Sequence, residues 1–315
     1  MPTKRIAAIA TEYRPRSHAD VIIGKFLRGF PCDDGVHAPR VEVTSLYLDQ
    51  VNPTDIGVAA AAEFGVPIYP SIRKALTLEE DGLAVDGVLI VGEHGDYPWD
   101  EYDRHLYPRR HFFEQVAGVF AESGRAVPVF TDKHLAYNWP DARWMYERAR
   151  CLGIPLMAGS SLPVAWRRPW CEHPLGAPIE AAVSIGYAGL ESYGFHALET
   201  LQCMVERRTG GETGVAGVRC VEGEALWDWL DAHPTHAALA EAAAGAIGET
   251  TGPWDRVREI AEHPAAFLVQ YRDGLTAATL MLSGFCGAFA YAALVGGEQE
   301  ACEFVLQAGE PHGHF

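Results

Sequence analysis

The sequence has few basic residues and no long apolar run. It contains 25 Lys and Arg against 42 Asp and Glu, a formal net charge of −17 at pH 7. Binding to nucleic acid or to an anionic membrane needs a concentrated basic surface, so we expect neither partner. No apolar run reaches the ~18 residues of a membrane span, and no basic-then-apolar leader is present. The sequence therefore predicts a cytoplasmic protein that acts on a small molecule.

The cysteines also lack a recognisable pattern. There are seven of them, widely spaced and without a CxxC pair. This arrangement is typical of neither a disulfide framework nor a zinc-thiolate site. We expect the cysteines to be reduced, in keeping with a cytoplasmic location.

Strand-like and helix-like segments alternate through the first half of the chain. The apolar runs typical of buried strands cover residues 5–11, 40–48, 87–92, 126–131 and 154–160. Segments with helical spacing lie between them, for example 19–30 and 139–153. This alternation predicts an α/β fold, a Rossmann-like doubly wound parallel sheet over residues 1–160.

After about residue 160 the alternation stops. Residues 181–187 are typical of a strand followed by a helix, and 265–282 of a hairpin that turns at Arg272-Asp273-Gly274. Prolines and arginines interrupt both periodicities over 160–170. We therefore predict a second domain over 161–315, an α+β substrate or oligomerisation domain with a largely antiparallel sheet.

Four segments in order resemble the Gfo/Idh/MocA family, the NAD(P)-dependent sugar dehydrogenases of the glucose-fructose oxidoreductase and inositol dehydrogenase type. They are EFGVPIYPSIRKAL, VDGVLIVGEHGDYP, GRAVPVFTDKHLA and YGFHALETLQCMVERRTGGETGV. They are similar to the segment after the family's second strand, its fourth strand and loop, its strand ending in Glu-Lys-Pro, and its second-domain helix with a substrate-facing histidine. The resemblance covers most of the chain and implies the fold, although a fold alone assigns no chemistry.

The loop after the first predicted strand lacks the family's glycines. The family's loop reads GxGxxG with a histidine three residues on, and here we take His18 as that histidine. The three glycine positions are then Ala10, Glu12 and Pro15. A carboxylate at the second position would face the pyrophosphate where the helix N-terminus should attract it. We therefore expect NAD(P) to bind weakly or not at all.

Acidic and imidazole side chains follow three strands that should be neighbours. They are Glu12, Glu93, His94, Asp132 and His134. Ligands bind beyond the carboxyl ends of strands in open parallel sheets, so we expect these side chains to share one crevice. Mixed His and carboxylate ligands suit divalent ions, which predicts Mn²⁺, Zn²⁺ or Mg²⁺ there. A solvated acidic rim is the alternative, since no sharp ligand motif such as HExxH is present.

The resemblance implies two catalytic residues. Lys133 falls on the lysine of the family's Glu-Lys-Pro motif, with Asp132 and His134 in place of its neighbours. His196 falls on the family's histidine general base, with Ser192 in place of the aspartate four residues before it. A surface lysine and a hydrogen-bonded core histidine are the ordinary alternatives.

Aromatic and charged residues predict a sugar-like substrate, either a polyol or a sugar acid. The expected contacts are Tyr97, Trp99, Trp166, Arg167 and Glu199. Aromatic faces stack on the C–H faces of sugar rings, carboxylates pair with hydroxyls, and arginine binds carboxylates. A packed loop over 95–111 and an interdomain linker over 160–169 are the alternatives.

These observations lead to one main function and two alternatives. The main prediction is metal-assisted acid/base chemistry of lyase, hydrolase or isomerase type, without ordinary NAD(P) binding. The first alternative is an NAD(P)-dependent sugar oxidoreductase whose phosphate loop uses Arg14 and Arg16. The second is a non-catalytic ligand-binding or partner subunit. We also expect a homo-oligomer. Because the sequence stops at EPHGHF, sooner than family members do, the resemblance implies either an incomplete second domain or an altered oligomer.

Overall fold

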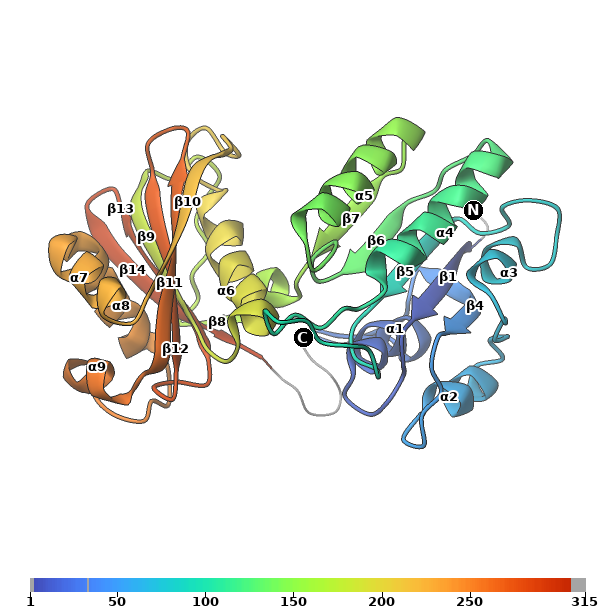
Figure 1. The fold of residues 1–315 in the computed structure, drawn as a ribbon, viewed down its shortest axis with the longest axis horizontal. Helices are drawn as coiled ribbons and strands as arrows, with labels where there is room; N and C mark the ends of the chain where they lie inside the picture. Colours follow the sequence, from blue (N-terminus) through green and yellow to red (C-terminus); the bar gives the residue numbers. More distant parts are fainter. Residues whose placement is uncertain (1–2, 33, 307–315) are drawn as a thin grey trace. The chain divides into compact units, whose positions relative to one another are not determined.

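The computed structural model describes residues 3–32 and 34–306. It contains two compact units, one within residues 3–160 and the other formed by Ser161–Leu306 (Figure 1). Within the described residues, no helix is both long and apolar enough to cross a membrane.

The first unit is built around a parallel sheet in the order β4-β1-β5-β6-β7. Its strands are β1 (Lys4–Ala10), β4 (Val41–Leu48), β5 (Gly87–Val91), β6 (Val129–Asp132) and β7 (Leu156–Gly159). The central strand β5 is buried along its whole length, as expected of a strand covered on both faces. The predicted doubly wound sheet is confirmed, with strand ends displaced by a few residues.

Helices cover both faces of this sheet. They are α1 (His18–Arg28), α2 (Gly57–Glu63), α3 (Ile72–Thr77), α4 (Arg109–Ser123) and α5 (Trp139–Leu152). Side chains of β1 alternate between two cores: Ala7 and Ile9 pack with α3, α4 and α5, whereas Ile6, Ala8 and Ala10 pack with α1 and α2. A small hairpin of β2 (Phe30–Cys32) and β3 (Gly35–His37) follows α1.

One further parallel bridge extends the sheet beyond β4. It joins Leu46 to Ile68, between α2 and α3. Counting this bridge as the third strand in chain order, the spatial order becomes third, second, first, fourth, fifth, sixth. This is the strand order of dinucleotide-binding folds, in which ligands bind where the order reverses. Here the reversal lies between β1 and β5.

The second unit is built around a mixed sheet in the order β10-β11-β12-β9-β13-β14-β8. Its strands are β8 (Trp166–Arg168), β9 (Ile179–Gly186), β10 (Val215–Glu222), β11 (Glu262–Tyr271), β12 (Thr276–Ser283), β13 (Phe289–Val295) and β14 (Glu298–Val305). Strands β9 and β12 are parallel, and the other neighbouring pairs are antiparallel. The predicted α+β class and the hairpin at Arg272-Asp273-Gly274 are confirmed.

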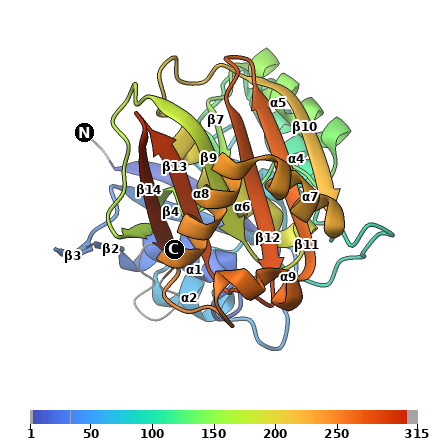
Figure 2. The same ribbon diagram turned by 90° about the vertical axis from the view of Figure 1, so that its left-hand side faces the viewer.

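Helices also cover both faces of the second sheet. Helix α6 (Leu190–Val205) packs on one face, where Leu162 of the short turn η1 (Leu162–Val164) joins the same core. Helices α7 (Glu224–Ala232) and α8 (Pro234–Ala246) lie across the other face (Figure 2). The turn η2 (Trp254–Arg256) and the single-turn helix α9 (Val257–Ile260) then lead into β11.

Candidate functional site

Side chains at the carboxyl ends of β1, β5 and β6 meet at one edge of the first sheet. Glu93, two residues beyond the end of β5, is buried and accepts hydrogen bonds from Lys133 Nζ at 2.8 Å and from Arg109 Nη2. Thr11 Oγ1 donates to the Glu93 backbone carbonyl at 2.7 Å, which ties the end of β1 to that of β5. The structure thus brings the residues after these strands together around a buried ion pair.

Glu12 lies at the second glycine position and is also buried. Its Oε1 accepts from Arg14 Nε and its Oε2 from Asn52 Nδ2, both at 2.7 Å. The Arg14 side chain also links the residues after β1 to those after β5, because its Nη2 lies 3.2 Å from His94 Nδ1. The carboxylate therefore points to cationic and amide groups of its own chain.

The start of α1 lies beside the end of β6. His18 Nδ1 is 2.6 Å from Asp132 Oδ2. Ser17 caps the helix by accepting from the Asp20 amide, while the Asp20 carboxylate accepts from the Arg16 amide at 2.9 Å. The backbone donors that bind phosphate in a glycine-rich loop are in part used by these caps.

Burial and charge set the protonation of this edge. Burial alone raises the pKa of Glu93, but Arg109 and Lys133 together hold it well below its usual range. Burial and the neighbouring His18 lower the pKa of His94 to about 4. Burial and Arg109 lower the pKa of His134 to about 3. At neutral pH the edge therefore has an ionised Glu93 and uncharged His94 and His134.

These contacts explain why the side chains predicted to bind a metal do not need a cation to compensate their negative charge. Repulsion among clustered carboxylates would favour a cation, but Arg14 compensates Glu12, and Arg109 with Lys133 compensates Glu93. Among residues 3–32 and 34–306, the close group of metal-ligating side chains is Cys171, His173 and Glu300 in the second unit, and the strand ends form none.

The aromatic loop over residues 95–107 is fastened to the end of β4. Tyr97 OH donates to Asp49 Oδ2 at 2.7 Å, and the Gln50 side chain makes two hydrogen bonds to the Asp96 backbone at 2.8 and 3.0 Å. Trp99 stacks on His105 at 4.1 Å and leaves 62% of its surface exposed. Tyr97 is thus a structural contact of this loop, whereas Trp99 has a ring face open to solvent.

Asp49 is a candidate that the sequence reasoning missed. It follows β4 directly, is exposed, and accepts from Tyr47 OH and Tyr97 OH, each at 2.7 Å. In dinucleotide-binding folds, an acidic residue after the second strand binds the ribose 2′-hydroxyl. The signal was present, because an Asp directly follows the strand predicted over 40–48.

The other predicted residues lie in the second unit. His196 is buried on α6, with the rings of Tyr193 and Phe289 at 5.8 and 6.2 Å, and Glu199 is half-buried one turn later. Trp166 is half-buried on the edge strand β8. Nothing in these contacts tests the predicted roles of the three residues.

Arg167 is engaged within its own unit. It donates to the carbonyls of Pro163 and Ala165 at 2.9 and 3.1 Å, and its guanidinium lies 4.7 Å from the centre of the Phe304 ring. These contacts fasten η1 to β8 and β14. The predicted contact of Arg167 with substrate stays a prediction.

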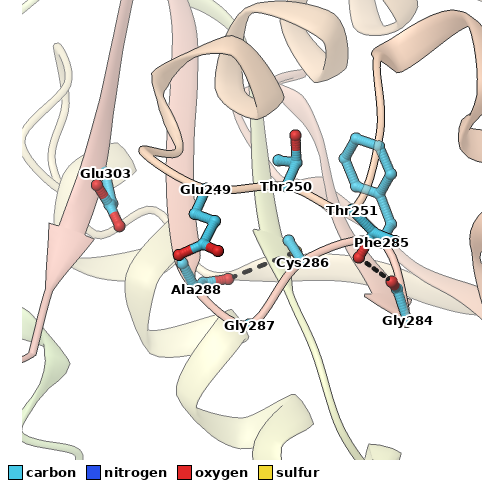
Figure 3. A pocket seen from close by; sticks show the side chains of 9 residues that line it. All are labelled: Glu249, Thr250, Thr251, Gly284, Phe285, Cys286, Gly287, Ala288 and Glu303. Atoms are coloured by element: carbon cyan, nitrogen blue, oxygen red, sulfur yellow. Dashed lines mark hydrogen bonds between the residues drawn. The ribbon is translucent and has the colours of Figure 1, made fainter.

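A pocket of about 570 Å³ opens elsewhere in the second unit (Figure 3). Its lining consists of residues 249–251, 284–288 and Glu303. Cys286 is its only thiol, and it donates to the Ala288 carbonyl at 3.8 Å, while burial raises the pKa of Cys286 to about 11. The other ionisable side chains of its lining are the carboxylates of Glu249 and Glu303, and the lining includes none of the residues predicted for the functional site.

Comparison with known proteins gives structural matches only. No family model and no curated protein matches the sequence. The NAD complex of GenD2 from gentamicin A biosynthesis matches 96% of this chain and 73% of its own, at 12% identity and a TM-score of 0.56. The structure of myo-inositol 2-dehydrogenase from Lactobacillus plantarum matches 95% of this chain and 76% of its own, at 12% identity and a TM-score of 0.51. The structure of UDP-N-acetylglucosamine 3-dehydrogenase GnnA from Acidithiobacillus ferrooxidans matches 96% of this chain and 75% of its own, at 12% identity and a TM-score of 0.50.

These matches correct two predictions. Two of the three similar structures are of dehydrogenases by name, one for myo-inositol and one for UDP-N-acetylglucosamine, and the structure of GenD2 has NAD bound. The predicted metal-dependent lyase, hydrolase or isomerase without NAD(P) binding is therefore wrong, as is the predicted Mn²⁺, Zn²⁺ or Mg²⁺ cofactor. At this low identity the likeness shows the fold, and the predicted resemblance to Gfo/Idh/MocA proteins is confirmed in that sense.

Proposed function

We propose that the protein is an NAD-dependent oxidoreductase that oxidises a secondary hydroxyl of a sugar or polyol, or reduces the corresponding carbonyl. The observation that carries the proposal is Asp49 at the end of the second strand of a sheet with dinucleotide-binding strand order. A carboxylate there accepts from a ribose 2′-hydroxyl and repels a 2′-phosphate. This favours NAD over NADP.

The loop after β1 fits a dinucleotide through side chains in place of glycine backbone. Arg14 already neutralises Glu12, and its side chain remains 41% exposed. Arg16 is exposed in the same loop. A guanidinium group can donate two parallel hydrogen bonds to the oxygens of one phosphate. Two arginines at this position therefore supply the positive charge that the capped start of α1 does not.

Lys133 is the residue we assign to the substrate oxygen. Its ammonium is buried and oriented by Glu93, which Arg109 holds from the other side. Lys133 has φ +64, and its amide donates to the Gly159 carbonyl at 2.9 Å, so the backbone holds a strained conformation in place. Two ammonium protons remain to donate to the substrate oxygen and to stabilise negative charge on it.

Oxidation of a secondary alcohol removes a hydride from carbon and a proton from oxygen. Bound NAD⁺ would supply the hydride acceptor. Lys133 donates to the oxygen and keeps it oriented, and we assign His196 as the base that takes the hydroxyl proton. The substrate class follows the similar structures, while Trp99 offers an exposed aromatic face for a sugar ring.

Calorimetric titration of NAD⁺ and NADP⁺ tests this proposal. We expect micromolar binding of NAD⁺ and weaker binding of NADP⁺. Asp49→Asn should weaken NAD⁺ binding by about tenfold, near 1.4 kcal/mol, and reduce the preference over NADP⁺. Tyr97→Phe is the matched control, because it removes one contact of Asp49 but keeps the carboxylate. Failure of wild-type protein to bind either dinucleotide would refute the proposal.

A further inference from the structure

Three side chains of the second unit form a compact cluster of metal-ligating atoms. Cys171 and His173 lie in the segment between β8 and β9, and Glu300 lies on β14. One ligand atom from each residue lies within 4.8 Å of those from the other two. Cys171 Sγ is 3.7 Å from Glu300 Oε2, and His173 Nδ1 is 3.2 Å from the same oxygen. None of these residues belongs to the site proposed above.

These separations match the edges of a zinc tetrahedron. Zinc binds sulfur at about 2.3 Å, and nitrogen or oxygen at about 2.0–2.2 Å. In a tetrahedron these bonds place the sulfur and oxygen ligands about 3.6 Å apart and the nitrogen and oxygen ligands about 3.4 Å apart. The observed 3.7 and 3.2 Å differ from these values by only a few tenths of an ångström. Two of the three edges thus have nearly the length that zinc requires, and the ligand atoms of Cys171 and His173, which form the third edge, lie within 4.8 Å of each other.

The surroundings hold two of the three ligands in place. His173 and Cys171 are 1% and 7% exposed. The second ring nitrogen of His173, Nε2, is 3.1 Å from the hydroxyl of the fully buried Tyr291. Histidines that bind metals characteristically use the other ring nitrogen for such an outer hydrogen bond, which orients the ring. The His173 carbonyl also accepts from Arg207 Nε.

We propose that Cys171, His173 and Glu300 bind one Zn²⁺, with water as the fourth ligand. The ion fastens the segment between β8 and β9 to β14 and takes no part in hydride transfer. Binding converts the Cys171 thiol to a thiolate and releases its proton to solvent. The alternative is that His173 Nδ1 carries a proton and donates an ordinary hydrogen bond to Glu300, with no metal ion between them.

Metal analysis and thermal melting of the untagged, full-length protein test the site. After chelation under reducing conditions and readdition of Zn²⁺, we expect one ion per chain. The melting temperature should rise by about 5 to 10 °C at free zinc near one hundred times the dissociation constant. Cobalt in place of zinc should give a thiolate charge-transfer absorption that Cys171→Ser abolishes.

Exposed Glu300 permits a variant that leaves the buried residues intact. Glu300→Gln should remove stoichiometric zinc and most of the melting shift. Glu298→Gln, also exposed and on the same strand, should keep both. Equal zinc binding by Glu300→Gln, or no zinc bound by the wild type, would overturn the proposal. So would a disulfide between Cys171 and its hydrogen-bonded neighbour Cys302 in the protein as purified.

Discussion

Glu93 shows how buried cationic partners can take the place of a metal ion at the end of a strand. The sequence correctly predicted that the residues after β1, β5 and β6 come together, but it could not identify their partners. Arg109 reaches Glu93 from the first turn of α4, and Gly92 permits this approach because a Cβ there would lie 2.7 Å from Arg109 Cγ. An acidic residue after a strand has the same local pattern whether it meets a metal or a guanidinium.

Replacing Glu93 tests the ion pair. Glu93→Gln leaves Arg109 and Lys133 buried without their counter-charge, so we expect a loss of about 3 to 5 kcal/mol in the free energy of unfolding at pH 7. Urea unfolding followed by tryptophan fluorescence measures this loss. A change below 1 kcal/mol would contradict the buried pair.

The same variant predicts a pH dependence. The pKa of Glu93 is lower in the folded protein than in the unfolded chain, because Arg109 and Lys133 outweigh burial. Its contribution to stability is thus complete above the unfolded pKa of about 4.3 and is lost as the pH falls below that value. Wild-type stability should therefore decline more steeply than that of Glu93→Gln between pH 4 and pH 2. Parallel curves would show that Glu93 is not the responsible group.

Lys133 is predicted to act on the substrate, and its replacement should separate activity from stability. Lys133→Met should lower kcat by a factor of about 10² or more, while Arg109 continues to neutralise Glu93 and limits the loss of stability. Steady-state kinetics with an identified polyol or sugar measures the effect. Lys74→Met, which removes an exposed lysine paired with Glu79, should leave kcat unchanged. Near-normal turnover in Lys133→Met would refute the assigned role.

At the scale of elements, apolar runs predicted the strands well because each buried parallel strand is apolar over its length. Two features had no such signal. The β2–β3 hairpin is made of short, mostly exposed strands, and the third strand of the first sheet is reduced to a bridge at Ile68. In the loop after β1, the absent glycines predict weak dinucleotide binding, whereas the neighbouring Arg14 and Arg16 indicate another way of binding phosphate.

The loop between β1 and α1 makes a prediction of its own. If Arg14 and Arg16 contact the pyrophosphate, Arg14→Ala and Arg16→Ala should each weaken NAD⁺ binding by about tenfold. Binding of adenosine, which lacks phosphate, should change little. Arg73→Ala, at an exposed position on α3, is the control. Equal losses for NAD⁺ and adenosine would show that these arginines support the fold and do not bind phosphate.

At the scale of the whole molecule, the sequence predicted the fold class of both halves. The parallel pairing of β9 with β12 could not be predicted from the sequence, because these strands are far apart in the chain and the residues of neither strand indicate which strand lies beside it. The expected homo-oligomer and cytoplasmic location stay predictions. The predicted metal-dependent chemistry is wrong because the missing glycines after β1 give no information about Arg14, Arg16 and Asp49, the residues through which we propose that the first sheet binds NAD.

The central claim is that the carboxyl edge of the first sheet binds NAD. A crystal structure of the protein grown with saturating NAD⁺ tests it most directly. We predict density for the adenosine ribose within hydrogen-bond distance of Asp49, the pyrophosphate beside Arg14 or Arg16, and the nicotinamide on the side of Lys133. Absence of dinucleotide density at this edge, or density at another place in the chain, would contradict the account.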